Sequence, residues 1–227
     1  MKPTAVPCPD WLAVHLQQAG GAITFRQFMT LALNDPDHGY YGAGHARIGP
    51  DGDFVTSPSL GTDFTALLAT QLIQWLKAFP QEMRLSIVEI GPGDGQFAAD
   101  LIQALSEHAA ALLPRVELVL VESAAGMRTR QQQRLDGEDR VPVRWCSLDE
   151  LRHQPVCGVV VAHELLDALP VERLQLHQGV LHQQMVALDE SDRLHWSFRP
   201  LPTTLKSDLE TTAARCGLRL PPDQAES

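Results

Sequence analysis

The stretch that decides the fold is Ser86-Ile87-Val88-Glu89-Ile90-Gly91-Pro92-Gly93-Asp94-Gly95-Gln96-Phe97. It reads as a short apolar strand, a glycine-rich turn and a helix that runs to about Leu105. Glycines at alternate positions let the backbone turn tightly and approach a ligand that a Cβ would push away. The turn leads into a helix N-terminus, where unpaired N–H groups face a ligand. The sequence therefore predicts a strand–turn–helix unit built for ligand binding.

Two nucleotide-type ligands use such a turn. Dinucleotide folds require G-x-G-x-x-G, and here Gln96 stands where the third glycine would be. Enzymes that bind S-adenosylmethionine (SAM) resemble E/D-x-G-x-G-x-G, which Glu89, Gly91, Gly93 and Gly95 match in full. SAM carries a sulfonium and an amino group but no phosphate, so a strand-end carboxylate suits it. The pattern favours SAM over a dinucleotide, and a tight turn without a ligand is the remaining alternative.

The next apolar run, Val116-Glu117-Leu118-Val119-Leu120-Val121-Glu122, also ends in an acid. A carboxylate at the end of the second strand of a doubly wound sheet commonly accepts hydrogen bonds from ribose hydroxyls. Glu122 is therefore the ribose candidate, and an ordinary solvated strand-end acid is the alternative.

Strands and helices alternate over the middle of the chain. This rhythm predicts an α/β fold with a Rossmann-like parallel sheet and helices on both faces. We expect a domain at 61–170, preceded by an N-terminal helical lid and cleft loop at 1–60 and followed by antiparallel strands and a helix at 171–227. The expected strands are about 86–90, 116–122, 141–145 and 157–162, and the expected helices about 95–106, 124–135 and 147–152.

The fourth expected strand runs into His163-Glu164-Leu165-Leu166-Asp167. These residues follow the carboxyl end of the strand, where ligands of such sheets bind. Glu164 and Asp167 are three apart, so on a helical turn they would share a side and could clamp a cationic group. A helix cap made of solvated acids is the alternative.

A glycine-rich loop near residues 37–58 supplies further candidates. Asp37-His38-Gly39-Tyr40-Tyr41-Gly42 holds both tyrosines of the chain, and His38 is either a base or a hydrogen-bonded structural residue. Gly52-Asp53-Phe54-Val55-Thr56-Ser57-Pro58 precedes a helix, so its polar residues either cap that helix or form a cradle for the amino acid end of a cofactor.

Composition excludes several classes of function. The chain has 227 residues, 44% of them hydrophobic, and a formal net charge of −10, which makes it a poor binder of nucleic acid or anionic membranes. The four cysteines are scattered without a C-x-x-C pair, so neither a zinc site nor a disulfide framework is expected. No signal peptide or membrane-spanning run is visible, and we expect a cytoplasmic protein with reduced thiols.

Four motifs together resemble the MidA family of SAM-dependent methyltransferases, over roughly residues 20–175. Mitochondrial members of that family are complex I assembly factors that dimethylate an arginine on a core subunit. The motifs are Asp37-His38-Gly39-Tyr40-Tyr41, Gly52 to Pro58, Val88 to Gly95, and Glu164-x-x-Asp167-Ala168-Leu169-Pro170.

The resemblance implies a class I SAM-dependent methyltransferase fold and a role for each matching position. The turn at Glu89, Gly91, Gly93 and Gly95 would hold SAM, with Glu122 on the ribose. Asp53, Thr56, Ser57 and Pro58 would line the cofactor cleft, His38, Tyr40 and Tyr41 would contact the substrate, and Glu164, Asp167 and His163 would serve the acceptor.

Three departures from the family pattern stand out. His163 replaces an asparagine, Ser59 replaces a glutamate, and this chain is much shorter than the family. A half-sheet would leave the fourth strand as an open edge, which predicts a homodimer or a tendency to aggregate.

The resemblance thus implies a SAM-dependent protein arginine methyltransferase, and we expect it to need no metal. An arginine guanidinium stays protonated in water, so a carboxylate pair would orient it and accept its proton. The expected partner is a protein substrate, a complex I subunit being one candidate. The alternative is a non-catalytic SAM-binding or assembly scaffold protein.

Overall fold

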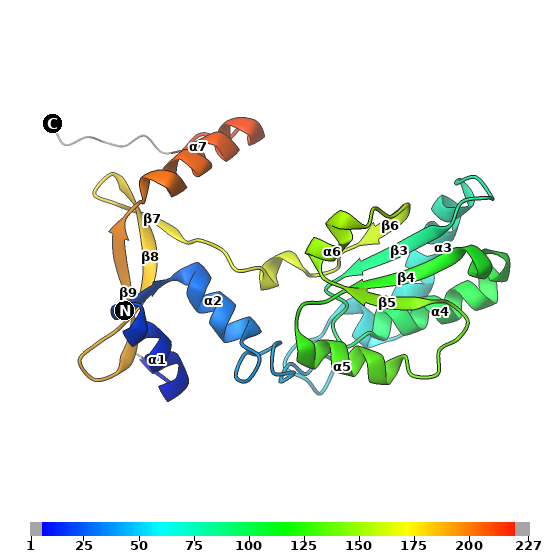
Figure 1. Cartoon of the computed structure of the whole chain (residues 1–227), viewed down its shortest axis with the longest axis horizontal. Helices are drawn as coiled ribbons and strands as arrows, with labels where there is room; N and C mark the ends of the chain where they lie inside the picture. Colours follow the sequence, from blue (N-terminus) through cyan, green and yellow to red (C-terminus); the bar gives the residue numbers. More distant parts are fainter. Residues whose placement is uncertain (1–5, 221–227) are drawn as a thin grey trace. The chain divides into compact units, whose positions relative to one another are not determined.

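The computed structural model describes residues 6–220 and divides the chain into two compact units (Figure 1). The central unit is the continuous stretch Ala32–Leu169, and the terminal unit joins Met1–Leu31 with Pro170–Ser227. This grouping differs from the expected regions 1–60, 61–170 and 171–227. The reason is a strand near the N-terminus that pairs with a strand from the C-terminal part, while the glycine-rich loop belongs to the central unit.

The central unit contains a four-stranded sheet in which every pairing is parallel. Its order is β5-β4-β3-β6, so the chain moves outward from β3 in one direction and then returns to add β6 on the other side. Such a reversal creates a crevice at the carboxyl ends of the strands, where open α/β sheets bind ligands. The strands are β3 (Leu85–Ile90), β4 (Val116–Val121), β5 (Val143–Cys146) and β6 (Gly158–Val161).

Helices cover both faces of this sheet, as the sequence predicts. Strand residues that point to one face of the sheet, such as Ile87 and Leu118, share a buried cluster with α3 (Asp63–Lys77) and α4 (Gln96–His108). The opposite face carries Val88, Val119 and Val121, against which Leu151 of α6 (Leu148–His153) packs. The expected fold class, a Rossmann-like α/β sheet, is confirmed.

Strand β6 lies at one edge of the parallel sheet. Val160 in its middle is 57% exposed, although a central strand of such a sheet would bury it. Within residues 6–220 this edge of β6 pairs with no further strand of the sheet.

The terminal unit is a five-stranded antiparallel sheet with helices. Leu12 and Leu16 of α1 pack on Ile23 and Val186 in a small core. Helix α2 starts at a capping box, in which Thr24 and Gln27 exchange two hydrogen bonds. The strands are β1 (Val6–Pro7), β2 (Ala22–Thr24), β7 (Leu174–His177), β8 (Val180–Leu188) and β9 (Arg193–Pro200), and the helices are α1 (Asp10–Gln18), α2 (Phe25–Asn34) and α7 (Thr203–Cys216).

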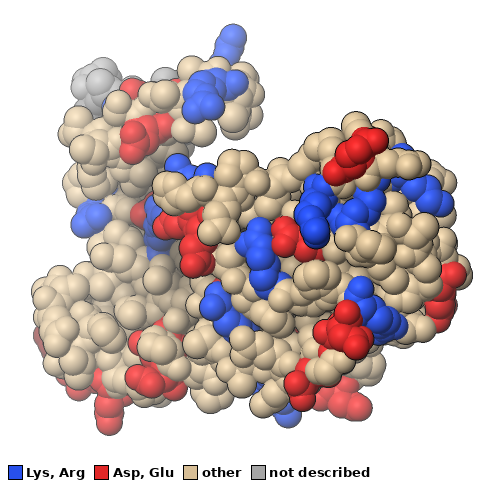
Figure 2. Space-filling view, turned by 45° about the vertical axis from the view of Figure 1, so that its right-hand side comes forward, with Lys and Arg blue, Asp and Glu red and all other residues tan. Residues whose placement is uncertain are grey.

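The surface carries charges of both signs. On the face that Figure 2 shows, acidic and basic side chains are interspersed and do not form a broad field of one sign. Over the described residues, no helix combines the length and the apolar character needed to cross a membrane.

Candidate functional site

The turn after β3 adopts the conformation that its glycines allow. Gly91, Gly93 and Gly95 have φ values of +71°, +55° and +83°, in the left-handed region that glycine alone adopts readily. A Cβ at Gly93 would lie 2.9 Å from Cδ1 of Ile48, and a Cβ at Gly91 would lie 2.9 Å from Cδ1 of Leu165. The turn, which we call the cradle, is therefore bare backbone against which the side chains of Ile48 and Leu165 pack, and α4 begins directly behind it.

Glu89 places a buried carboxyl group beside this cradle. Its side chain is 6% exposed, and among the described residues Oε2 has no hydrogen-bond partner. Burial, followed by the nearby charge of Asp94, raises the pKa of Glu89 to about 8. A buried acceptor without a partner is costly, so this position favours a ligand that brings a cation or a donor.

Glu122 lies directly after β4 and is held in place by α5 (Ala125–Arg134). Its Oε1 accepts a hydrogen bond from the backbone N–H of Ala124 at 2.8 Å, and Oε2 accepts one from Nε2 of Gln131 at 3.0 Å. Burial raises the pKa of Glu122, although these hydrogen bonds and Arg128 oppose the shift. The carboxylate is thus fixed at the carboxyl end of the strand next to the glycine turn.

Gln131 is the residue that sequence reasoning missed. It is fully buried, and its Nε2 also donates to the carbonyl oxygen of Gly93 at 2.7 Å, while Oε1 accepts from Nε1 of Trp145 at 3.0 Å. One amide therefore ties the glycine turn, Glu122 and β5 together. The available signal was its place in the series Met127, Gln131, Leu135, where a polar residue occupies the buried face of a helix.

The glycine-rich loop is held largely by its own side chains. Asp53 accepts hydrogen bonds from the hydroxyl of Tyr40 at 2.9 Å and from the backbone and guanidinium of Arg47 at 3.1 and 3.2 Å. Burial and the Asp53 carboxylate raise the pKa of Tyr40 to about 12. His38 lies 3.2 Å from Asp35, whose carboxylate also caps the backbone at this turn. In this structure Asp53 and His38 therefore order the loop itself.

Tyr41 packs edge-on against Tyr40, with ring centroids 5.0 Å apart. Burial raises its pKa, and the charges of Asp167 and Glu122 add to the shift. Tyr41 is thus a loop residue whose pKa is affected both by Glu122, the ribose candidate, and by Asp167, an acceptor candidate.

Thr56, Ser57 and Pro58 lie where a short 3-10 helix, Ser57–Leu60, begins. The backbone N–H of Thr56 donates to the hydroxyl of Ser59 at 3.0 Å, so Ser59 acts as a capping residue. These contacts are local to the 3-10 helix, and α3 (Asp63–Lys77) begins without a side-chain cap. Both interpretations of Asp53, Thr56 and Ser57 therefore stay predictions, and Pro58 is buried.

The acceptor candidates follow β6. The ring of His163 lies 5.1 Å from that of Phe64, centroid to centroid. Glu164 and Asp167 are exposed, and Glu164 has a left-handed φ of +49°. The expectation that both acids share one helical turn is wrong, because the only turn is the 3-10 helix Leu166–Ala168, which starts after Glu164. A left-handed non-glycine residue beside a ligand crevice is typical of functional sites.

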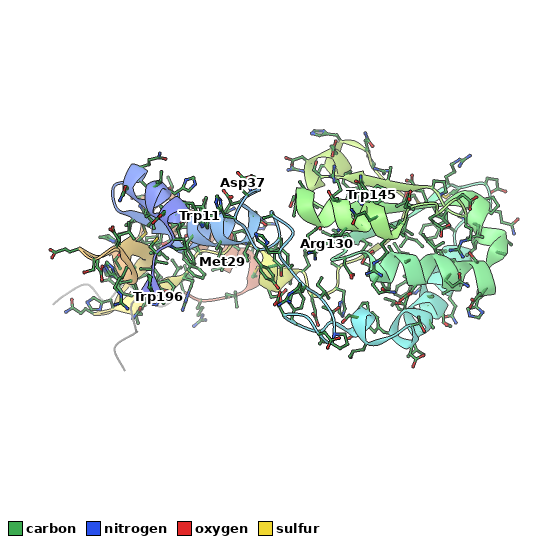
Figure 3. All side chains as sticks on the ribbon, turned by 90° about the horizontal axis from the view of Figure 1, so that it is seen from below. Trp11, Met29, Asp37, Arg130, Trp145 and Trp196 are labelled. Carbon is green, nitrogen blue, oxygen red and sulfur yellow. The ribbon has the colours of Figure 1, made fainter. Side chains whose placement is uncertain are left out.

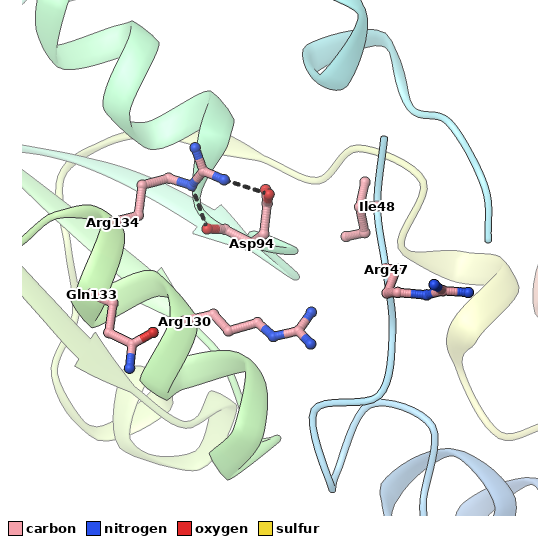
Figure 4. Close-up of a pocket in the computed structure, with 6 residues that line it drawn as sticks. All are labelled: Arg47, Ile48, Asp94, Arg130, Gln133 and Arg134. Carbon is pink, nitrogen blue, oxygen red and sulfur yellow. Dashed lines mark hydrogen bonds and ion pairs between the residues drawn. The ribbon is translucent and has the colours of Figure 1, made fainter. Parts of the chain in front are cut away.

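A pocket of about 510 Å³ opens beside the glycine turn (Figure 4). Arg134 on its wall forms an ion pair with Asp94 at 2.7 Å, and Arg130 points from α5 toward the segment that carries Ile48. Figure 3 labels Arg130 and Trp145 within the same central unit. The pocket is lined by Arg47, Ile48, Asp94, Arg130, Gln133 and Arg134.

Comparison with known proteins defines the class. A family model described as "putative S-adenosyl-L-methionine-dependent methyltransferase" matches residues 67–226, and the chain belongs to this family. The expected membership of the MidA-type methyltransferase family is therefore confirmed.

Particular relatives sharpen that result. The chain is 30% identical over 203 residues to the mitochondrial protein arginine methyltransferase NDUFAF7 of Xenopus tropicalis, covering 79% of this chain and 46% of the relative. It is 26% identical over 226 residues to the human NDUFAF7 protein, covering 89% and 51%. The chain thus spans about half the length of the curated relatives that it matches.

Solved structures agree with the fold. A protein from Burkholderia thailandensis bound to S-adenosyl-homocysteine matches with a TM-score of 0.70 and 29% identity, over 91% of this chain and 56% of that one. A native structure from the same organism matches with a TM-score of 0.67 and 28% identity, over 93% and 54%.

The residues in place fit the cofactor of the family. The left-handed glycines leave the backbone of the turn without Cβ atoms, as the close approach of a ligand requires, and the unpartnered Oε2 of Glu89 suits a cationic group. Glu122 supplies carboxylate oxygens fixed in orientation beside that cradle.

Proposed function

We propose that this chain binds S-adenosyl-L-methionine at the glycine turn and methylates an arginine side chain of a protein. The observation that carries the proposal is the buried carboxyl of Glu89, with one oxygen unpartnered, at the start of a turn made of left-handed glycines. Arginine as the acceptor is supported by the names of the mitochondrial relatives, with identities of 26–30%.

The cofactor, when bound, supplies an electrophilic methyl group. The chain's own part is to bind and orient. Gly91, Gly93 and Gly95 place no side chain of their own between the backbone and the ligand. Glu89 accepts a hydrogen bond from the amino group of the cofactor, and Glu122 accepts hydrogen bonds from the ribose hydroxyls. Asp53, Thr56, Ser57 and Pro58 line the cofactor cleft in this proposal, and the hydrogen bonds of Asp53 and Thr56 within the loop hold that lining in shape.

Acceptor chemistry falls to the residues after β6. An arginine guanidinium is planar and always protonated, so it must be oriented and must lose a proton as it gains a methyl group. Glu164 is our first candidate for that role and Asp167 the second, with His163 in support and His38, Tyr40 and Tyr41 as substrate contacts. Exposed carboxylates at the mouth of the crevice suit a large, cationic substrate that enters from solvent.

The test separates binding from transfer. Isothermal titration measures the affinity for SAM and S-adenosylhomocysteine, and a radiolabelled methyl assay measures transfer to arginine peptides, with lysine-substituted peptides as controls. Glu164→Gln should abolish transfer and leave both affinities unchanged, while Glu190→Gln, an exposed acid in a turn of the terminal unit, should change neither. Normal turnover by the Glu164 variant would show that the assignment is wrong.

The same assay addresses the scaffold alternative. Binding with no transfer to any acceptor would favour a non-catalytic SAM-binding or assembly scaffold protein. Peptides from core subunits of respiratory complex I are the first acceptors to try, because the family resemblance implies them.

We also propose a second copy of the chain as a partner along the edge of β6. Unpaired backbone groups and the 57% exposed Val160 make that edge suitable for strand pairing. Light scattering of the purified chain should give the mass of a dimer, and a clean monomer at high concentration would count against the pairing.

A further inference from the structure

A short segment of the glycine-rich loop, residues 42–48, lies along helix α5, and we call it the strap. The backbone N–H of Gly126 donates to the carbonyl oxygen of Gly42 at 3.2 Å. A Cβ at Gly126 would collide with the backbone nitrogen of Gly44, so two glycines cross here in backbone contact. Ala46 is fully buried and shares a small core with Met127.

Arg130 fastens this strap to the helix. Its Nη1 donates to the carbonyl oxygen of Ala46 and its Nη2 to that of Gly44. These carbonyls are two residues apart, so one planar guanidinium holds two carbonyl groups of the strap at once. A charged donor shared by two carbonyls binds more strongly than neutral hydrogen bonds do.

The strap reaches the glycine turn. A Cβ on Gly93 would come within 2.9 Å of Cδ1 of Ile48, at the end of the strap. Just before the strap, burial raises the pKa of Tyr41, and the charges of Asp167 and Glu122 add to this shift. On the neighbouring positions of α5, Gln131 holds the Gly93 carbonyl and Glu122. One helix therefore sets the spacing between the glycine turn, the ribose candidate and the strap.

We propose that Arg130 is a positioning residue that holds the strap closed along the cofactor turn and so slows the release of the bound cofactor. This rests on the proposed function, because it assumes that the turn binds SAM or S-adenosylhomocysteine. Arg130 also lines the pocket beside the turn, but both of its guanidinium hydrogen bonds go to the strap. It acts through Gly44 and Ala46, whose backbone places Ile48 against Gly93.

Stopped-flow binding of S-adenosylhomocysteine to the full chain tests the proposal. Arg130→Ala should raise the dissociation rate constant at least about tenfold, the size expected for losing charge-assisted hydrogen bonds, and change the association rate constant far less. Arg130→Lys keeps the charge but cannot bridge two carbonyls with a planar fork, so it should restore the rate only in part. Arg152→Ala removes an equal charge at a side chain that is 81% exposed and should leave both rate constants unchanged.

Hydrogen–deuterium exchange without a ligand gives a second, independent readout. The amides of Gly44 and Ala46 donate to carbonyls of Tyr41 and Tyr40, and Arg130→Ala should speed their exchange while β3 and β4 stay protected. Unchanged exchange at these amides, or an unchanged dissociation rate in a variant that binds, would overturn the proposal. If the wild-type chain fails to bind S-adenosylhomocysteine, the proposed function fails, and the exchange experiment still decides whether Arg130 holds the strap.

Discussion

The two halves of the crevice differ in how they are built. At the ends of β3 and β4, Glu89 and Gln131 are buried and Glu122 is held by two hydrogen bonds. At the end of β6, Glu164 and Asp167 are exposed, and no hydrogen bond or ion pair of either side chain is found among the described residues. The first half is organised before any ligand arrives, and the second presents free carboxylates at a sheet edge.

This difference suggests a division of labour. A small cofactor must be recognised group by group, which requires fixed partners and excluded water. A protein acceptor brings its own surface, so the residues that meet it can stay solvated until it binds. Substitutions on the β3–β4 side should therefore change cofactor affinity and stability together, whereas those on the β6 side should change transfer without affecting affinity.

The largest loss of cofactor affinity on the β3–β4 side of the crevice is expected for Gly93→Arg. A side chain at φ +55°, pressed against Ile48, should fill the cradle and weaken S-adenosylhomocysteine binding more than about 100-fold, as measured by titration calorimetry. Gly137→Arg is the matched control, since its φ is +74° and a Cβ there meets nothing within 4 Å. Equal losses in both variants would mean that backbone strain, and not occupation of the cradle, causes the effect.

The next largest effect is a dependence of cofactor affinity on pH, which we expect from the buried carboxyl group of Glu89. Because the pKa of Glu89 is raised to about 8, the side chain must lose a proton to meet a cationic ligand, so affinity should rise by up to about tenfold per pH unit between pH 5.5 and 7. Glu89→Gln should bind with little dependence on pH over this range. Calorimetry in buffers of different ionisation enthalpy should detect the released proton in the wild type alone.

The stability of the fold also depends on the protonation of Glu89, but it should fall as the pH rises, whereas cofactor affinity should increase. A carboxyl whose pKa is higher in the folded chain than in the unfolded chain stabilises the fold at low pH and loses that contribution as the pH rises toward 8. Without a ligand, the melting temperature of Glu89→Gln relative to the wild type should therefore increase from pH 5 to pH 8. A difference that stays constant with pH would show that Glu89 is ionised in the free protein.

A smaller effect is expected at Gln131. Gln131→Leu removes the amide that serves Gly93, Glu122 and Trp145, and should lower the free energy of unfolding by about 2–4 kcal/mol, together with a roughly tenfold loss of affinity. Gln132→Leu, on the exposed side of the same helix, is the control. Chemical denaturation and titration of the same samples would show whether stability and cofactor affinity are lost together. That coupling is expected if the β3–β4 side is organised before the cofactor binds.

The smallest expected effect is a change in stability on the β6 side of the crevice. Glu164→Gly should raise the free energy of unfolding by about 0.5–1 kcal/mol, because glycine adopts φ +49° without strain. Gln178→Gly, with the same φ in a turn of the terminal unit, should give a similar gain. A loss of stability on replacing Glu164 would mean that its carboxylate has a structural partner, and the contrast between the two halves would then be wrong.

Sequence patterns predicted the parts of this site that depend on local spacing. The glycine turn, Glu89 and Glu122 could be found because alternating glycines and strand-end acids are visible within a few residues. Gln131 and Arg130 could not, because their partners at Gly93, Gly44 and Ala46 lie 38 to 86 positions away. Strand β2 was missed for the same reason, since three residues acquire strand character only through pairing with β8.

The pairing of β2 with β8 also bears on how the chain is made. The central unit is one uninterrupted stretch and can complete its sheet once residue 169 has left the ribosome. Ala22 pairs with Ala187 and Thr24 with Met185, so the terminal unit must wait for almost the whole of the intervening chain to be translated. During synthesis α1 and α2 are therefore made first, but the sheet on which they pack forms last. The central unit can fold before that sheet is complete.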